Sequence, residues 1–347
     1  MIRYVQNKPI NYARIEQLLD QSRQAGVFTN NGPVKQLLEK KLETLFGLDK
    51  SKRVVCTSSG ASALYVLMNL FEKKLGKKLK WVTPAFNFPA ATVNRLDTEI
   101  LDIELEGYSL PLSCLSDYDG IVITTLFGTL PLHLPKIITY CQNNNKILIL
   151  DNASSPLTNL NNQNINSLGS AAIGSLHHTK YLGFAEGGFA VIPHDLYNEL
   201  NALTNFGFND ARKYCNYASN AKMSDVSAAF ALSHIESYDI EKHLKIQQTY
   251  ISEISNLSGV KVFNLSENPQ DKVVYGNMPV VFAKPINHLV FRDVGIEANK
   301  YYAPLKPLPN SQNLFDRIIN FPLYSDLSDY DLDMIFKKIG IEAKKCS

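Results

Sequence analysis

The sequence predicts an α/β fold with a mostly parallel central sheet covered by helices on both faces. Two observations support this fold class. Strand-like and helix-like segments alternate along the first half of the chain, and several strands are apolar almost without interruption, as at residues 146–150. The length of 347 residues is large for one compact domain, so we expect one large domain and a smaller one.

The elements of the large domain are expected in a regular order. A first helix is expected where Ile15, Leu18 and Leu19 recur at helical spacing, and a second begins at Gly32 and Pro33, because proline suits a first helical turn. Strands are then expected at residues 53–56, 81–83, 99–103, 120–125, 146–150 and 189–192, with helices at residues 61–71, 90–95 and 134–141.

The rhythm changes after about residue 190. A long helical stretch over residues 224–257 is expected to lead into strands at 260–263 and 278–282 and a closing helix at 329–339. We place the boundary near residue 235, which gives a large α/β domain over residues 1–235 and a smaller α+β domain over residues 236–347. The Asn-rich segment 159–166 is expected to be a loop.

Composition favours a small-molecule partner. Hydrophobic residues make up 45% and charged residues 20%, and the net charge of +2 gives no electrostatic reason to expect binding to nucleic acid or to a membrane surface. No apolar run approaches the ~20 residues that span a bilayer, and the start lacks a signal-peptide core, so we expect a cytoplasmic protein. The five cysteines are scattered, which favours reduced thiols.

The first segment that suggests chemistry is Thr-Ser-Ser-Gly-Ala-Ser-Ala at residues 57–63, between a strand and a helix. Small residues there let the backbone come close to a ligand, and the N–H groups at a helix start favour a phosphate. The same residues would also suit a simple helix cap.

The second is Asp151, at the C-terminal end of an apolar strand, where open α/β sheets bind ligands. A buried carboxylate that faces a protonated ring nitrogen keeps both groups charged, as pyridoxal chemistry requires. A helix N-cap and a metal ligand remain alternatives.

The third is the polar, glycine-rich segment 174–188, which contains Lys180. A lysine that forms a Schiff base must be able to lose its proton, and partial burial lowers its pKa. A solvated loop lysine is the alternative. His177 and His178 suggest zinc, but adjacent histidines on a strand point to opposite faces and no third ligand has useful spacing, so we reject a metal site.

The fourth is the segment 216–225, where Ser224 is suited to cap the helix that follows. In this order, the segments resemble the DegT/DnrJ/StrS family of nucleotide-sugar aminotransferases. The resemblance covers nearly the whole chain, through residues 29–33, 58–64, 83–89, 151, 175–188, 220–224, 304–305 and 321–324. It implies the type I fold of pyridoxal-phosphate (PLP) dependent transferases, with a mostly parallel sheet flanked by helices and a smaller C-terminal α+β domain.

The resemblance also implies roles for individual residues. Lys180 matches the Schiff-base lysine, Asp151 the carboxylate that pairs with the pyridine nitrogen, and Phe88 the aromatic ring that stacks on the cofactor. The phosphate is expected at the N–H groups of Gly60 and Ala61 and the hydroxyl of Ser175, with Ser154 nearby. Asn220 matches a residue that reaches the cofactor phosphate of the neighbouring subunit, which implies a homodimer with shared active sites.

The chain departs from the family's usual pattern at three positions: Ala61 stands where threonine is usual, Ser154 where glutamine is common, and Lys222 where arginine is frequent. Because backbone donors remain at Ala61, we expect altered cofactor contacts and retained function. Residues beside the matched motifs are expected to contact the substrate, namely Phe28, Thr29, Asn30, Asn31, His178 and Lys222.

The implied reaction moves an amino group from glutamate, leaving 2-oxoglutarate, to a 4-keto-6-deoxyhexose linked to UDP or dTDP. The product would be a 4-amino-4,6-dideoxy sugar of the viosamine or perosamine type, used in glycan biosynthesis. Amination at C3 and a non-catalytic binding or regulatory protein are the alternatives. A related dehydratase would have histidine in place of Lys180, and an amino-acid aminotransferase would want an arginine clamp that no motif supplies.

Overall fold

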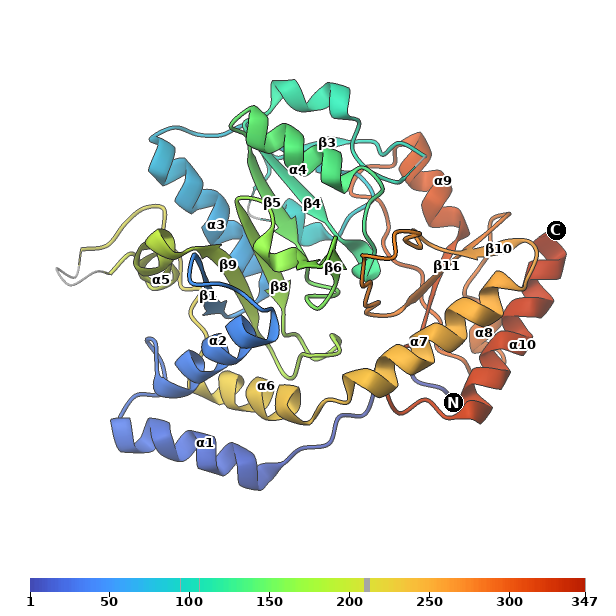
Figure 1. Cartoon of the computed structure of the whole chain (residues 1–347), viewed down its shortest axis with the longest axis horizontal. Helices are drawn as coiled ribbons and strands as arrows, with labels where there is room; N and C mark the ends of the chain where they lie inside the picture. The colour runs from blue at the N-terminus through green and yellow to red at the C-terminus, as the bar shows by residue number, and fades with distance from the viewer. Residues whose placement is uncertain (94, 106, 209–212, 347) are drawn as a thin grey trace.

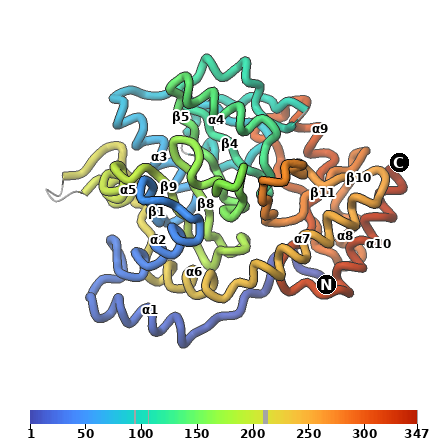
Figure 2. Tube along the Cα trace, in the orientation of Figure 1, coloured from blue at the N-terminus to red at the C-terminus, as the bar shows by residue number. Residues whose placement is uncertain are grey.

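The computed structural model describes residues 1–93, 95–105, 107–208 and 213–346. A sheet with helices on both sides forms the larger part of the molecule, and the elements of the C-terminal third lie beside it, with helix α7 running between the two parts (Figures 1 and 2). Both chain ends lie on the C-terminal side. The proposed boundary near residue 235 stays a prediction.

The central sheet has seven strands in the order β1-β9-β8-β5-β4-β2-β3. These are β1 (Lys52–Thr57), β2 (Trp81–Pro84), β3 (Glu99–Leu101), β4 (Gly120–Thr124), β5 (Ile147–Asp151), β8 (Ala171–Ser175) and β9 (Gly188–Pro193). Strand β9 is antiparallel to both neighbours and the other pairs are parallel, so the predicted mostly parallel sheet is confirmed. The carboxyl ends of β1, β2, β4, β5 and β8 therefore share one edge.

Helices cover both faces of this sheet because its strands are apolar on both sides. One face packs against α1 (Tyr12–Ala25), α2 (Pro33–Leu45), α4 (Leu134–Asn143) and α6 (Asp225–Ser237), and the other against α3 (Gly60–Leu75) and α5 (Tyr197–Thr204). Successive strand residues alternate between the two cores: Val54 and Cys56 join the first and Val55 the second. This explains why the strand sequences show no polar alternation.

The C-terminal part has its own antiparallel sheet, ordered β10-β11-β12, and its own hydrophobic core. Its elements are α7 (Ile240–Ser255), β10 (Val260–Val262), β11 (Met278–Phe282), α8 (Leu289–Arg292), α9 (Pro309–Arg317), β12 (Ile318–Phe321) and α10 (Asp329–Cys346). The first residues of the chain join this part, since the Ile2 N–H donates to the Gly295 carbonyl at 2.8 Å.

Two predicted helices differ from the structure. In place of a helix at residues 90–95 there is a 3₁₀ turn, η1 (Pro89–Ala91), and Arg95 turns back to bond Glu72 of α3 at 3.1 Å; Asn94 lies outside the described residues. The single helix expected over residues 224–257 is two helices, α6 and α7. Asp239 separates them because its carboxylate caps α7, accepting from the Lys242 N–H at 2.9 Å.

The Asn-rich segment is also more ordered than a loop. It forms a small antiparallel hairpin of β6 (Asn159–Leu160) and β7 (Gln163–Asn164), with Asn161 and Asn162 in left-handed conformations at φ 49° and 63°. Asparagine tolerates this conformation better than most residues. The high asparagine content that suggested a loop therefore also permits the tight turn of the hairpin.

Four further 3₁₀ turns complete the described elements: η2 (Leu112–Asp117), η3 (Leu126–Gly128), η4 (Ile165–Ser167) and η5 (His194–Leu196). Within the part of the chain that the structure describes, every helix is too short or too polar to cross a lipid bilayer.

A buried carboxylate, Asp225, joins three helices on one face of the sheet. Its oxygens accept from the Ser22 hydroxyl at 2.6 Å and from the N–H groups of Val34 and Lys35 at 3.1 and 2.9 Å. It thereby caps α2 from the start of α6 and contacts α1. Only glycine fits at Gly32, since a Cβ there would lie 2.3 Å from the Asp225 carboxylate.

We expect Asp225→Ala to lower the free energy of unfolding by about 2–4 kcal/mol, because buried donors lose a charged acceptor. Urea unfolding followed by circular dichroism measures this. Asp329→Ala, at an exposed first-turn position of α10, is the control, with an expected change within about 0.5 kcal/mol. Equal losses in the two variants would contradict the capping role.

Candidate active site

A cavity of about 390 Å³ lies at the sheet edge where the parallel strands end. Residues at or just after the ends of five strands line this cavity. They are Gly60 and Ala61 after β1, Phe88 after β2, Thr124 at the end of β4, Asp151 at the end of β5, Ser175 at the end of β8 and Lys180 in the loop after β8. The structure therefore brings together residues that are up to 120 positions apart in sequence, from Gly60 to Lys180.

Asp151 is a buried carboxylate at the floor of this cavity, with only 2% of its surface exposed. It accepts from the Ala153 N–H at 3.0 Å and from the Thr124 hydroxyl at 3.3 Å. Burial raises the pKa of Asp151, and these two donors and the positive charge of Lys180 oppose that rise. A second cation beside Asp151 would strengthen its charged form.

Lys180 lines the same cavity from a loop of consecutive turns that follows β8. Its backbone N–H donates to the His177 carbonyl at 2.8 Å, and its own carbonyl accepts from the Gly183 N–H at 2.9 Å, so the chain is fixed on both sides of the lysine. Burial lowers the pKa of Lys180, and the negative charge of Asp151 opposes the shift. An amine with a lowered pKa is easier to deprotonate and more reactive as a nucleophile.

The N-terminus of α3 forms a small-residue cradle at the cavity. The Ser59 hydroxyl accepts from the Ser62 N–H at 3.0 Å, and the N–H groups of Gly60 and Ala61 belong to the first helical turn, which has no carbonyl partners within the helix. Gly188 of β9 must be glycine, because a Cβ would lie 2.2 Å from the Gly60 nitrogen. The absence of a side chain at Gly188 therefore allows β9 to lie close to the N-terminus of α3.

Two aromatic rings and a serine complete the side of the cavity toward the C-terminal part. Phe88 is 44% exposed, and its ring contacts that of Tyr302 edge-on, with centroids 5.2 Å apart. Tyr302 is stacked on Phe127, with ring centroids 5.6 Å apart, and Ser154 lines the same cavity. Burial and the charge of Asp151 raise the pKa of Tyr302, so it stays a neutral phenol beside the carboxylate.

These residues fit PLP, the expected cofactor. The buried Asp151 accepts from two neutral donors, and no cation among the described residues is bonded to it. A protonated ring nitrogen would supply one. The cradle at Gly60 and Ala61 offers N–H groups to a phosphate, and the Ser175 hydroxyl, which accepts from the His177 N–H at 3.2 Å, retains its proton to donate. The exposed ring of Phe88 lies in the same cavity.

Other predicted residues lie outside this cavity. Asn30, Asn31 and Lys222 line a second, polar pocket of about 490 Å³ between α2 and α5. Asn220 is exposed, and its side-chain oxygen accepts a hydrogen bond from the Lys222 ammonium. The backbone at this point lies beside the end of β1, because the Ser58 N–H donates to the Ala221 carbonyl at 2.7 Å. The predicted site residues therefore form two groups on one chain.

The remaining substrate-side residues belong to neither pocket lining. Phe28 is 42% exposed and its carbonyl accepts from the Asp225 N–H at 2.8 Å, while Thr29 is exposed. The ring of His178 packs edge-on against Phe184 at 5.5 Å, and the neighbouring His177 lines the cavity of Lys180 instead. Both histidines lie in the turns after β8, not on a strand, and the described residues contain no cluster suited to a metal ion.

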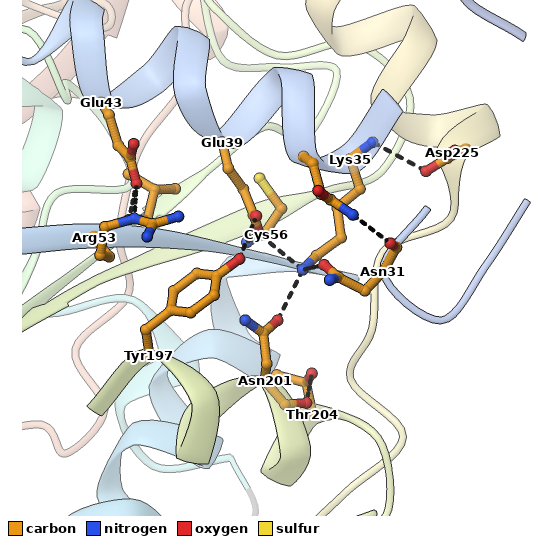
Figure 3. A network of polar contacts seen from close by, with 12 residues as sticks. Asn31, Lys35, Glu39, Glu43, Arg53, Cys56, Tyr197, Asn201, Thr204 and Asp225 are labelled. Carbon is orange, nitrogen blue, oxygen red and sulfur yellow. Dashed lines mark hydrogen bonds and ion pairs between the residues drawn. The ribbon is translucent and has the colours of Figure 1, made fainter. Parts of the chain in front are cut away.

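A buried polar network supports the second pocket (Figure 3). The Lys35 ammonium pairs with the Glu39 carboxylate at 2.7 Å, with both side chains 2% exposed, and donates to the side-chain oxygens of Asn31 and Asn201, each at 2.9 Å. Glu39 also accepts from the Cys56 N–H at 2.8 Å and from the Tyr197 hydroxyl at 3.1 Å. Lys35 thus holds Asn31, whose φ of 69° is left-handed, against α5.

Sequence reasoning missed several residues of the Lys180 cavity. Tyr302 and Tyr324 come from the C-terminal part, and Gln6 and Lys8 from the first residues of the chain. Tyr302 and Tyr324 lie close to or within the matched segments 304–305 and 321–324, which was the available signal for them. Lys8 gave no signal, because a lysine in a short polar stretch is usually solvated.

The sheet and the helices on both of its faces match those of solved aminotransferase structures. The profile of the DegT/DnrJ/EryC1/StrS aminotransferase family matches residues 9–340. The chain belongs to this family. The predicted family, fold and class of enzyme, an aminotransferase, are thereby confirmed.

Individual relatives have low sequence identity but match at least 90% of this chain. A Shigella dysenteriae protein named dTDP-4-amino-4,6-dideoxy-D-glucose transaminase is 24% identical over 345 residues, 90% of this chain and 91% of that protein. The structure of DesI, solved in the presence of its TDP-sugar product, is 21% identical with a TM-score of 0.83, covering 99% and 93% of the two chains. Spr1654 from Streptococcus pneumoniae in its PMP form is 18% identical with a TM-score of 0.85 over 100% of both chains, and its PLP form has also been solved.

We expect Lys35→Met to lower the free energy of unfolding by about 3–5 kcal/mol, because it leaves the buried Glu39 carboxylate without its cation. The double variant Lys35→Met/Glu39→Gln removes both charges and keeps an oxygen for the Cys56 N–H, so it should be more stable than Lys35→Met alone. Urea unfolding of the single and double variants measures the coupling. A double variant at least as unstable as Lys35→Met would refute this account of the pair.

Proposed function

We propose that this chain is a PLP-dependent aminotransferase that moves an amino group from glutamate to a 4-keto-6-deoxyhexose carried by dTDP or UDP. The product is a 4-amino-4,6-dideoxy sugar. The observation that carries the proposal is that Asp151 and Lys180, each with a pKa shifted by burial, line one cavity at the carboxyl ends of the sheet. The name of the Shigella dysenteriae relative supports amination at C4 and a dTDP-linked sugar.

The cofactor's proposed position follows from the cavity lining. The N–H groups of Gly60 and Ala61 and the Ser175 hydroxyl hold its phosphate, Phe88 stacks on its ring, and Asp151 holds the proton on its ring nitrogen. Ser154, where glutamine is common, and Tyr302 both line the cavity that contains Asp151. The missing hydroxyl at Ala61 is offset by Ser59, whose side chain lines the same cavity.

Lys180 has two proposed roles: its side-chain amine would hold PLP, and the same amine would carry protons to and from the reacting carbon of the substrate. PLP supplies the carbonyl carbon that takes the amino group and a ring that accepts electrons. Lys180 is suited to both roles, because burial favours its neutral amine and the negative charge of Asp151 favours its protonated form. The side chain can therefore both give and take a proton. The fixed backbone on both sides of Lys180 directs its side chain into the cavity.

The competing interpretations make different predictions about product and spectrum. An aminotransferase acting at C3 would use the same protein groups and is separated from our proposal only by the position of the new amine. A non-catalytic protein on this fold would have no need for a lysine with a lowered pKa beside a buried carboxylate. A cytoplasmic location stays a prediction.

We also propose a homodimer with shared active sites. The residues at Asn30, Asn31, Asn220 and Lys222 are polar, partly exposed and apart from the Lys180 cavity of their own chain. Aromatic side chains with 42–45% exposure lie near them: Phe28 precedes Asn30 in sequence, Phe208 lines the second pocket, and the Lys222 ammonium lies 4.8 Å from the centre of the Phe206 ring. Apolar side chains around a polar pocket suit a protein interface, and Asn220 would then reach the phosphate in the partner's cavity.

The Lys180 role predicts a visible absorption band when the protein is loaded with PLP. Lys180→Ala should lack this band and lose about 10²–10⁴-fold or more in turnover, because the amine is both attachment point and proton carrier. Glutamate should shift the wild-type band, and dTDP- or UDP-4-keto-6-deoxyglucose should yield a 4-amino sugar identified by mass spectrometry and NMR. Lys52→Ala, at the opposite end of β1, is the control and should keep the band.

A wild-type protein without a Lys180-dependent band would reject the aminotransferase in favour of a binding protein. An amine at C3 of the product would instead reject the C4 assignment and leave the enzyme class standing.

Shared sites predict that two inactive variants restore activity when mixed. In a hybrid dimer of Lys180→Ala and Asn220→Asp, one site has both substitutions and the other has neither. After random reassociation, half of the dimers are hybrids, so about a quarter of wild-type activity should return. If Asn220 serves its own chain's site, every site carries a substitution and no activity returns. The unmixed variants, treated in the same way, are the control.

A further inference from the structure

Lys8 is a buried lysine in the stretch that precedes α1. Only 7% of its surface is exposed, and its ammonium donates to the carbonyls of His178 at 2.7 Å, Lys180 at 2.5 Å and Gly183. An ammonium has three N–H donors, so all three are used. These acceptors lie in one short loop, the one that carries Lys180.

The loop depends on a cation at this point. Its turns already use the N–H groups of Lys180 and Gly183, which bond the carbonyls of His177 and Lys180 at 2.8 and 2.9 Å. The carbonyls that bond Lys8 all point toward its ammonium. Without the Lys8 ammonium, the partly buried carbonyls of His178 and Gly183 would lose this donor, and the Lys180 carbonyl would keep only its bond from the Gly183 N–H. Each lost partner costs free energy.

The other end of the same stretch is tied to the C-terminal part. The Ile2 N–H bonds the Gly295 carbonyl at 2.8 Å, and the Gln6 side-chain amide donates to the Asp326 carboxylate at 2.6 Å. Residues 2–8 thus form a strap, which we name the N-terminal strap, from the turns at Gly295 and Asp326 in the C-terminal part to the Lys180 loop. Because the strap is bonded at both ends, the position of Lys8 beside the Lys180 loop is fixed.

A lysine is an unfavourable choice for a packing role here. Burial lowers the pKa of Lys8 to about 7, so its charge is costly where it lies. None of the ion pairs among the described residues includes Lys8, so only the loop carbonyls compensate the charge. An apolar side chain would fill the same space at lower cost, but it could not bond three carbonyls.

We propose that Lys8 is a positioning residue for Lys180: its ammonium gathers the carbonyls of residues 178, 180 and 183 and so fixes the loop from which the Lys180 side chain enters the cavity. This role rests on the proposed function, in which Lys180 is the reactive lysine. Lys8 also lines the cavity, but its ammonium donates to the loop carbonyls.

The test replaces Lys8 with methionine, which keeps the length of the side chain and removes its donors. Hydrogen exchange of the full-length protein, measured by mass spectrometry without cofactor and with PLP, should be about 10-fold faster or more in the peptide covering residues 178–183. Exchange in β5 and β8 should stay as in the wild type. With PLP and substrates, turnover should fall about 10²-fold while KM for the keto-sugar changes less than about threefold.

Lys146→Met is the matched control. The Lys146 ammonium also donates to two backbone carbonyls, of Ser116 at 2.8 Å and Tyr118 at 2.6 Å, but it lies at the end of β5 opposite to Asp151. It should lose comparable thermal stability and keep wild-type exchange in the Lys180 loop and wild-type turnover. Lys8→Gln, which retains two N–H donors without the charge, gives an intermediate effect and serves if Lys8→Met does not fold.

The outcomes separate the two proposals. If Lys8→Met and Lys8→Gln lose stability as Lys146→Met does but leave loop exchange and turnover unchanged, Lys8 is only a structural tie and the inference is wrong. A wild-type protein without a Lys180-dependent absorption band would remove the proposed function. The exchange measurement without cofactor would still decide whether Lys8 holds the loop.

Discussion

The buried carboxylate of Asp151 is the constraint on which the site depends. A negative charge with 2% exposure is unfavourable unless its surroundings compensate it. Among the residues that the structure describes, only the Ala153 N–H, the Thr124 hydroxyl and the nearby charge of Lys180 do so. The strand order determines this arrangement, because parallel neighbours bring the ends of β4, β5 and β8 to one edge. The incomplete compensation is what suits the cavity to a cationic ring.

The same architecture places polar residues of one chain in two separate pockets. The strand ends and the start of α3 build the cavity of Lys180, whereas α2, α5 and the segment around Lys222 build the second pocket. The second pocket has its own rigid support, because the buried pair of Lys35 and Glu39 holds Asn31 in a left-handed conformation (Figure 3). A second, preorganised polar surface is what a site completed by another copy of the chain requires.

The sequence predicted the sheet and its covering helices, because apolar strands leave a local pattern. The joint roles of Asp151 and Lys180 were implied by the family resemblance, since the residues alone left other interpretations open. The sequence predicted the helix breaks less well. The separation of α6 from α7 depends on one capping carboxylate, Asp239, and the failure of a helix at residues 90–95 accompanies the buried contact of Arg95 with Glu72. Tertiary contacts decide such features, and so do the contributions of Gln6, Lys8 and Tyr302, which reach the cavity from the chain's two ends.

Three lysines in this protein show how the surroundings of an amine decide its chemistry. Lys35 is paired with a carboxylate and bonded to two amide oxygens, and Lys8 is bonded to three carbonyls, so neither has a free position for another group. Among the residues that the structure describes, the Lys180 ammonium has no hydrogen-bond partner and only the attraction of Asp151 to offset its burial. An amine that is buried but not bonded is the one whose lone pair is available, and its neighbour Lys8 uses its own bonds to hold that amine's backbone in place.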